Sequence, residues 1–295
     1  MNIIKETIIN CRPNLSKSSV VTYASILKSL YINVFGVPKD DDYNMANFKK
    51  HLEILHYLQN IEPNRRKTIL SALVIITDNK EYRDQMLEDI KAYNIETHKQ
   101  EKTPEQAENW VEQNDIKTLF GDLENEAKIL YKKKNLSKGD LQNIQNYIIV
   151  AVLGGVFIPP RRSKDYVAFK IDGVDRDIDN YMDKNKFIFN TYKTAKTYGK
   201  QTIDVPSGLC KIIKKWIKVN PTEHLFFDNN LNPLTNVKLN QRMNKIFGKK
   251  ASVNVMRHSY LSSKYADKID VLKALKTDFK DMGSSDKQFE IYVQK

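Results

Sequence analysis

Two adjacent arginines, Arg161 and Arg162, follow a long apolar segment and lie shortly before Asp165. A guanidinium is permanently charged and offers a planar fork of N–H donors that suits the oxygens of a phosphate. Two neighbouring arginines are costly to bury unless a carboxylate pairs with them. We therefore interpret Arg162 as a phosphate-binding residue held by Asp165, with an ordinary surface ion pair as the alternative.

Further basic residues lie in two other segments. Residues 192–200 (YKTAKTYGK) separate two apolar stretches that read as strands, and their Thr-Tyr-Gly-Lys sequence is typical of a turn. Arg257 follows Asn254 by three residues in a segment with helical spacing, so both project from one side of the expected helix. Tyr292 lies near the end of the sequence. A hairpin lysine is usually only solvated and a lone tyrosine usually packs, so no single group identifies a site.

The order of these groups resembles the tyrosine recombinase (phage integrase) family. The first arginine of that family stands in an Arg-x-x-Glu-like motif, which Arg162 and Asp165 match. Its catalytic lysine lies on a β-hairpin, where Lys193 is the closest match. Its second arginine precedes His-Ser in a helix, as Arg257 does, and its nucleophile corresponds to Tyr292. The sequence style is most similar to divergent members from large DNA viruses or mobile elements.

The sequence departs from the family at two positions. Asn254 stands where the family usually has histidine, and Ser284 stands where it has histidine or tryptophan. Both side chains can hydrogen-bond a phosphate oxygen, but Asn254 cannot shuttle a proton at neutral pH. His258 is expected to be structural. The resemblance assigns DNA-binding or supporting roles to Arg161, Asp165, Lys196, Lys200 and His258.

The resemblance implies a reaction without cofactor, metal ion or ATP. Arg162 and Arg257 would hold the scissile phosphate, and Tyr292 would attack it to form a 3′-phosphotyrosine. A free tyrosine has a pKa near ~10, and two guanidinium groups nearby would favour its anion. Lys193 would protonate the leaving 5′ oxygen.

Helical and strand periodicity predicts an α+β fold, mainly α with a small antiparallel sheet. The N-terminal part resembles the helical core-binding (SAM-like) DNA-binding domain of the family, and the remainder its catalytic domain. We expect these domains over residues 1–95 and 106–295, joined by a polar linker at 96–105. The expected helices cover residues 16–34, 45–58, 63–77, 82–95, 104–113, 116–132, 138–153, 207–219, 235–247, 252–266 and 270–280. The expected strands cover 165–172, 186–191 and 201–205.

The formal net charge of the 295 residues is +12, which favours a polyanionic partner. Most of the 48 basic residues are lysines, a bias that an AT-rich genome also produces. Together with the resemblance, the charge predicts binding to double-stranded DNA, and the resemblance implies a homotetramer on that DNA. The N-terminus lacks the features of a signal peptide and the apolar runs are too short to cross a bilayer, so we expect a DNA-associated intracellular protein, in the host cytoplasm or nucleus or in a virion.

Three other interpretations remain open. A catalytically silent DNA-binding relative would explain the substitutions at positions 254 and 284. A type IB-like topoisomerase would use the same chemistry without choosing sites or exchanging partners. A lysine-rich helical scaffold would make the motifs a coincidence. Cys11 and Cys210 are far apart and show no spacing typical of a metal site or disulfide.

Overall fold

The computed structural model describes residues 3–39 and 42–286, so Tyr292 lies outside the described residues. The chain divides into two compact units, residues 1–102 and 103–295. Both are mainly helical, and the second contains a small sheet, which confirms the predicted α+β class. Within the described ranges, each helix is too short or too polar to span a membrane.

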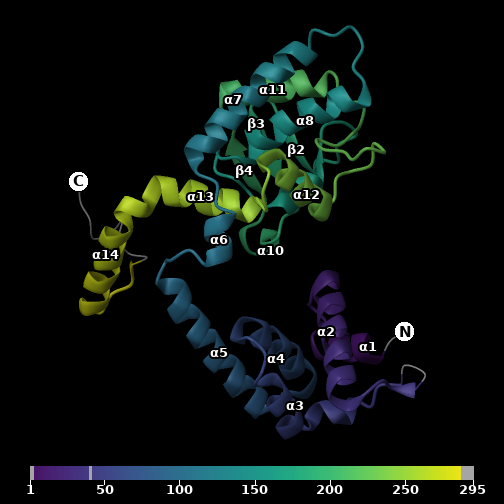
Figure 1. The fold of residues 1–295 in the computed structure, drawn as a ribbon, viewed down its shortest axis with the longest axis vertical. Helices are drawn as coiled ribbons and strands as arrows, with labels where there is room; N and C mark the ends of the chain where they lie inside the picture. Colours follow the sequence, from purple (N-terminus) through teal and green to yellow (C-terminus); the bar gives the residue numbers. More distant parts are fainter. Residues whose placement is uncertain (1–2, 40–41, 287–295) are drawn as a thin grey trace. The chain divides into compact units, whose positions relative to one another are not determined.

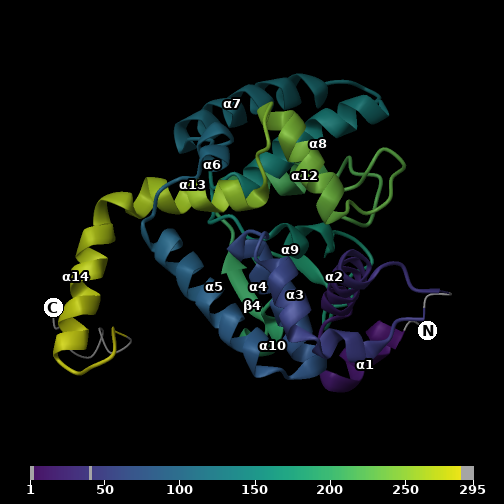
Figure 2. The same ribbon diagram turned by 60° about the horizontal axis from the view of Figure 1, so that its bottom comes forward.

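The N-terminal unit is a bundle of short helices, in which α4 lies between α2 and α5 (Figures 1 and 2). Its elements are α1 (Ile3–Cys11), α2 (Lys17–Phe35), η2 (Met45–Lys49), α3 (His51–Leu58), α4 (Pro63–Thr77) and α5 (Lys80–His98). The sequence did not predict α1, and it predicted one helix where η2 and α3 are separated at Lys50. The first residues of the expected linker continue α5 instead.

Local capping explains where the helices of this bundle begin. The hydroxyl of Ser16 accepts the Ser19 backbone N–H at the start of α2, and Pro63 occupies the first turn of α4. A buried ion pair then joins α4 to α5, because both Arg66 Nε and Nη2 donate to Asp89. These contacts all lie within the first unit.

The described part of the second unit contains ten helical segments in addition to the sheet. Before the sheet come α6 (Pro104–Glu108), α7 (Gln113–Leu130), α8 (Lys138–Leu153) and α9 (Ser163–Val167). Within and after it come α10 (Ala195–Tyr198), α11 (Ser207–Ile217), α12 (Asn236–Phe247), α13 (Val253–Tyr265), η3 (Ala266–Lys268) and α14 (Ile269–Asp281). The capping box of Ser137 with Asp140 begins α8 at the predicted residue.

The sheet has four strands in the order β1 (Phe169–Lys170), β2 (Asn180–Asp183), β3 (Lys186–Phe189) and β4 (Gln201–Asp204). It is mixed, since β1 pairs with β2 in parallel and the other pairs are antiparallel. The predicted strand at 165–172 was largely wrong, because its first residues form α9, and β2 was missed. The cause is tertiary: Tyr166 packs its ring against three phenylalanines of the sheet, which the alternating pattern does not reveal.

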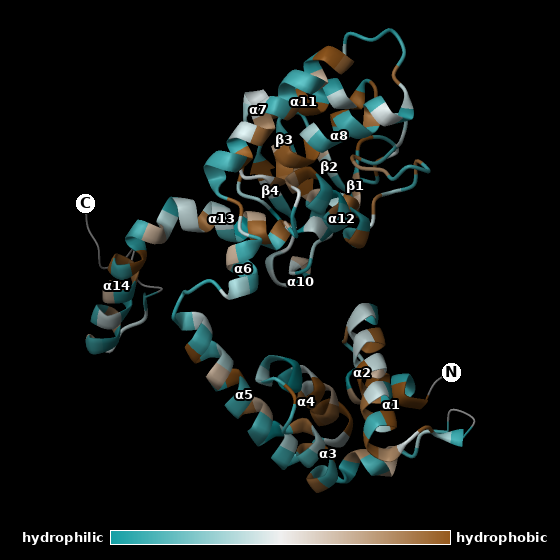
Figure 3. Ribbon diagram, in the orientation of Figure 1, coloured by the Kyte–Doolittle hydropathy of each residue, from teal (hydrophilic) through white to brown (hydrophobic). Residues whose placement is uncertain are grey.

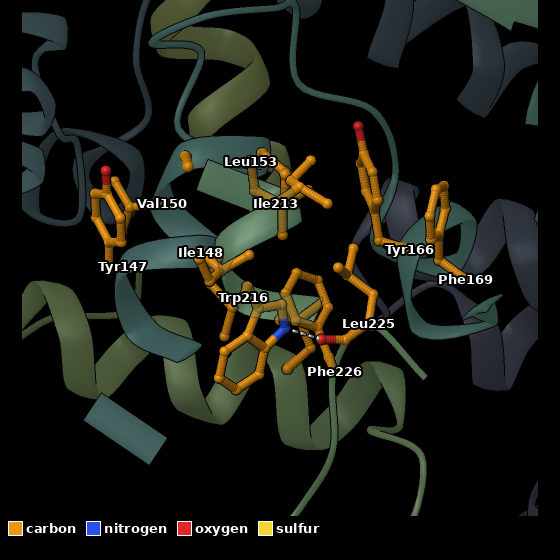
Figure 4. Close-up of a cluster of buried hydrophobic side chains, with 14 of the residues drawn as sticks. Tyr147, Ile148, Val150, Leu153, Tyr166, Phe169, Ile213, Trp216, Leu225 and Phe226 are labelled. Atoms are coloured by element: carbon orange, nitrogen blue, oxygen red, sulfur yellow. Dashed lines mark hydrogen bonds between the residues drawn. The ribbon is translucent and has the colours of Figure 1, made fainter. Parts of the chain in front are cut away.

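The core of this unit lies between the sheet and α8, α11 and α12, where the ribbon is most hydrophobic (Figure 3). Trp216 is fully buried there and stacks on Phe227 with ring centroids 5.8 Å apart. Its indole N–H donates to the carbonyl oxygen of Leu225 over 2.9 Å, as Figure 4 shows. This core supports the loops that carry the basic residues.

Gly155 allows α13 to pack against the end of α8. Its φ of +78° disfavours any side chain, and an added Cβ would lie 2.7 Å from Cδ2 of Tyr260. We expect Gly155→Ala to destabilise the protein by about 2 kcal/mol or more in chemical denaturation. Gly121→Ala is the matched control, because its Cβ would meet no atom within 4 Å and should stabilise α7 by about 1 kcal/mol. Equal stability of the two variants would contradict this packing role.

Candidate phosphate-binding site

The arginine loop, defined as residues 159–165, leads from the end of α8 into α9. Asp165 is buried in it, and its Oδ2 accepts a hydrogen bond from Nε of Arg161 over 2.9 Å. The sequence predicted an ion pair between Asp165 and Arg162. That prediction is wrong, because Asp165 pairs with Arg161. Arg162 takes an extended backbone conformation at the N-cap of α9, while Arg161 reaches Asp165 four residues later.

Arg161 also connects the arginine loop to the base of the lysine hairpin, which we define as residues 190–200, and to the flanking ends of β3 and β4. Its Nη1 donates to the side-chain oxygen of Gln201 over 2.8 Å. Its guanidinium carbon lies 4.1 Å from the ring centroid of Phe189 and 5.1 Å from that of Tyr192. The Nε and Nη1 donors of Arg161 are thus occupied within the protein.

Loss of this connection should destabilise the second unit. We expect Arg161→Ala to lower the free energy of unfolding by about 3 kcal/mol, since Asp165 would remain as a buried carboxylate without its ion-pair partner. Arg176→Ala is the control, because Arg176 pairs with Asp183 in an exposed position where such pairs contribute about 0–1 kcal/mol. Urea unfolding of both variants measures the difference, and equal losses would contradict the structural role of Arg161.

The pKa of Asp165 is affected by arginines from two distant segments of the chain. Burial raises the pKa of Asp165, and Arg161, Arg162 and Arg257 oppose that rise through their positive charges. Oδ1 of Asp165 is buried and accepts no hydrogen bond from any described residue. The carboxylate therefore lies within electrostatic range of both arginines that the sequence selected.

The guanidinium forks of Arg162 and Arg257 have no hydrogen-bond or ion-pair partner among the described residues. Both side chains are partly exposed. Because Arg161 takes the ion pair with Asp165, the two remaining guanidiniums are available to an external anion. The negative charge of Asp165 attracts both guanidiniums and so offsets part of the repulsion between them.

Helix α13 presents Arg257 through buried contacts on its opposite side. Ser259 is buried, and its hydroxyl oxygen lies 3.1 Å from Nε2 of Gln113, which donates to it from the start of α7. Met256 is fully buried in the core. The side chains of Asn254 and His258 are exposed, and neither side chain makes a hydrogen bond with another described residue.

The lysine hairpin exposes all three of its lysines, Lys193, Lys196 and Lys200. A short helix, α10, forms where the sequence predicted a turn, and the Tyr192 hydroxyl closes the loop by donating to the carbonyl oxygen of Gly199 over 2.7 Å. Tyr192 is buried, whereas the next residue, Lys193, is exposed to solvent.

Ser284 is not joined to these groups. Its backbone N–H donates to the carbonyl oxygen of Phe279 at the end of α14, and among the described residues no hydrogen bond connects it to the arginine loop or to Arg257.

Sequence reasoning missed the polar residues that hold the site together, Gln113, Asn180 and Gln201. No motif marks them, because their partners are distant in the chain. The described part of the chain contains no cluster of three or more His, Cys, Asp or Glu side chains suited to a metal ion.

Comparison with known proteins gives similarities of structure only. No protein-family model matches the sequence, and no curated protein matches it. XerA recombinase is 13% identical, with a TM-score of 0.35 over 89% of this chain and 84% of that chain. Lambda integrase(75–356), solved as a dimer bound to a COC′ core site, is 10% identical, with a TM-score of 0.44 over 90% of each chain. The XerH site-specific recombinase, bound to difH substrate, is 12% identical, with a TM-score of 0.41 over 99% of this chain and 90% of that chain.

Proposed function

We propose that this chain is a site-specific DNA recombinase or integrase that cleaves and rejoins DNA through a 3′-phosphotyrosine. The observation that carries the proposal is the pair of guanidinium forks of Arg162 and Arg257, which have no hydrogen-bond or ion-pair partner among the described residues and whose charges both act on the buried Asp165. A phosphodiester is the anion that such a pair suits best, because each fork can donate two parallel hydrogen bonds to its oxygens. The lysine hairpin, tied to the same loop by Arg161, supplies a proton donor.

In the cleavage step, the phenolic oxygen of Tyr292 attacks phosphorus after releasing its proton to solvent. The bond between that oxygen and phosphorus forms as the bond from phosphorus to the 5′ oxygen breaks. The 5′ oxygen takes a proton from the ammonium of Lys193 and leaves as a hydroxyl. Rejoining reverses these transfers, so the energy of the broken phosphodiester is retained in the phosphotyrosine.

Arg162 and Arg257 would stabilise the charge that builds on the non-bridging oxygens during this attack. Phosphoryl transfer depends mostly on positioning and charge stabilisation, so a rigid pair of guanidiniums is the main requirement. Asn254 is exposed on the helix that carries Arg257 and can add one hydrogen bond from its amide. We assign to Ser284 a single hydroxyl donor to the same phosphate.

We further propose that both units bind one double-stranded DNA and that a homotetramer assembles on it. The net charge of +12 supports a salt-sensitive affinity for the phosphate backbone. The N-terminal bundle would act as the core-binding domain. Gel retardation at increasing salt tests this part, because a protein that retards no duplex at low salt would contradict DNA binding altogether.

Covalent trapping tests the chemistry. The protein is incubated with a pool of nicked duplexes of varied sequence, the mixture is denatured, and any protein-bound DNA is digested for peptide mapping. We expect an adduct that survives denaturation and maps to the peptide containing Tyr292. Retardation of DNA without any adduct, across a pool that covers many sequences, would instead support a catalytically silent DNA-binding relative, which Asn254 in place of histidine favours.

A further inference from the structure

Asn180 is a buried polar residue that no motif predicted and that the catalytic scheme does not use. It is the first residue of β2 and only 1% exposed. Its Nδ2 donates to the carbonyl oxygens of Asp165 over 2.9 Å and of Thr191 over 2.8 Å. Its Oδ1 accepts the backbone N–H groups of Asn190 over 3.0 Å and of Thr191 over 2.9 Å.

These four hydrogen bonds join two segments that carry different parts of the site. Asp165 belongs to the arginine loop, whereas Asn190 and Thr191 form the start of the lysine hairpin, two residues before Lys193. Beyond Thr191, the buried Tyr192 closes the hairpin onto Gly199. The position of Lys193 therefore depends on the stem that Asn180 holds.

A carboxamide is well suited to this place. Asn180 uses both of its N–H donors and accepts two hydrogen bonds at one oxygen, which satisfies the whole side chain inside the protein. An aspartate of the same shape has no donor for the two carbonyl oxygens when it is ionised, and an aliphatic side chain would leave four backbone groups without partners. The site at Asn180 therefore requires a side chain with both donors and an acceptor, and a side chain of the same size without them would not suffice.

We propose that Asn180 is a positioning residue that holds Lys193 in place relative to the phosphate bound by Arg162 and Arg257. The inference rests on the proposed function, because it assumes that Lys193 is the proton donor. Asn180 touches no reacting atom in this scheme. Its effect on the reaction would pass through the lysine hairpin, and this predicts a chemical signature that a purely structural role lacks.

The experiment compares two suicide duplexes, one with the natural 5′ oxygen at the scissile phosphate and one with sulfur at that bridging position. When Tyr292 attacks the second duplex, the bond from phosphorus to sulfur breaks and sulfur leaves as a thiolate, which has a conjugate-acid pKa of about 8.5 in the comparable cysteine and needs no proton. We expect Asn180→Ala to cleave the natural duplex at least about tenfold more slowly, with the roughly 10²–10⁴-fold contribution of a positioned proton donor as the upper limit of the loss. Cleavage of the sulfur-containing duplex should remain near the wild-type rate.

Three control variants calibrate the result, and a fourth variant can replace Asn180→Ala. Lys193→Ala should show the same selective rescue by sulfur, and Arg257→Ala should not be rescued. Asn185→Ala is the matched control, since Asn185 is an exposed asparagine in the turn between β2 and β3 and should cleave both duplexes normally. Asn180→Ser keeps one hydroxyl that can donate and accept and places no charge in the buried site, so it provides the same comparison if Asn180→Ala melts below the assay temperature.

The outcomes separate the inference from the proposed function. Equal slowing on both duplexes, or no slowing on either, would overturn the positioning role of Asn180 while cleavage by the wild-type protein upheld the proposed function. If the wild-type protein cleaves neither duplex, the proposed function fails and the inference fails with it. Selective rescue of Asn180→Ala by sulfur supports both.

Discussion

Tyr292→Phe is expected to abolish the covalent adduct with DNA and to leave non-covalent binding unchanged. The substitution removes one oxygen atom, which is the only atom that can form the phosphotyrosine in the proposed reaction. The positive charges that would hold the duplex are unaffected, so the affinity for DNA should stay within about twofold of the wild type. Denaturing gels of trapped complexes measure the adduct, and gel retardation measures binding.

Tyr198→Phe is the matched control for this prediction. Tyr198 is an exposed tyrosine of the lysine hairpin, so it tests whether any accessible phenol near the basic residues can act. This variant should form the adduct at the wild-type level. An adduct that persists in Tyr292→Phe and disappears in Tyr198→Phe would reassign the nucleophile.

Arg257→Ala and Arg162→Ala are each expected to reduce cleavage by about 10²–10³-fold or more. Each removes a charged donor pair from the oxygens that gain negative charge, and a single lost donor at such a position costs on this order. Neither guanidinium makes a hydrogen bond or ion pair with another described residue, so the melting temperature should change little. Single-turnover cleavage of a nicked duplex and thermal unfolding together separate the two effects.

Conservative and remote substitutions sharpen the test of the arginine pair. Arg257→Lys keeps the charge and loses the fork, so it should recover only part of the cleavage rate. Arg176→Ala removes a charge from the exposed loop before β2 and should cleave normally. Normal cleavage by Arg257→Ala would contradict its assignment as a phosphate ligand.

Arg161 and Arg162 illustrate how adjacent identical residues take different roles. The two are indistinguishable by type, but Arg161 is directed into the protein toward Asp165, Gln201 and the aromatic rings of the hairpin stem. Arg162 has an extended backbone conformation at the start of α9, and its guanidinium has no partner in the part of the chain that the structure describes. Arg161→Ala is therefore expected mainly to lower the free energy of unfolding. Arg162→Ala is expected to reduce the rate of DNA cleavage while the protein stays folded.

The sequence by itself determined the elements whose cause is local. The helices expected at 16–34, 63–77 and 138–153 begin within one residue of α2, α4 and α8, where the Ser16 hydroxyl, Pro63 in the first turn and the Ser137 capping box act locally. Helical periodicity likewise predicted α12 and α13, and with α13 the segment that carries Arg257. These features need only neighbouring residues, so a single sequence is enough to predict them.

Only the tertiary structure decided the pairing within the site and the form of the sheet. The parallel pairing of β1 with the unpredicted β2 places Asn180 beside Asp165 and the start of the lysine hairpin. The partner of Asp165 is Arg161 because the chain turns into α9 at Arg162. Each of these outcomes depends on contacts between segments that are far apart in the chain, and residue type and spacing do not encode the direction in which a side chain points. The sequence thus selected the arginines and the lysine hairpin, whereas the packing decided which guanidiniums remain free for a phosphate.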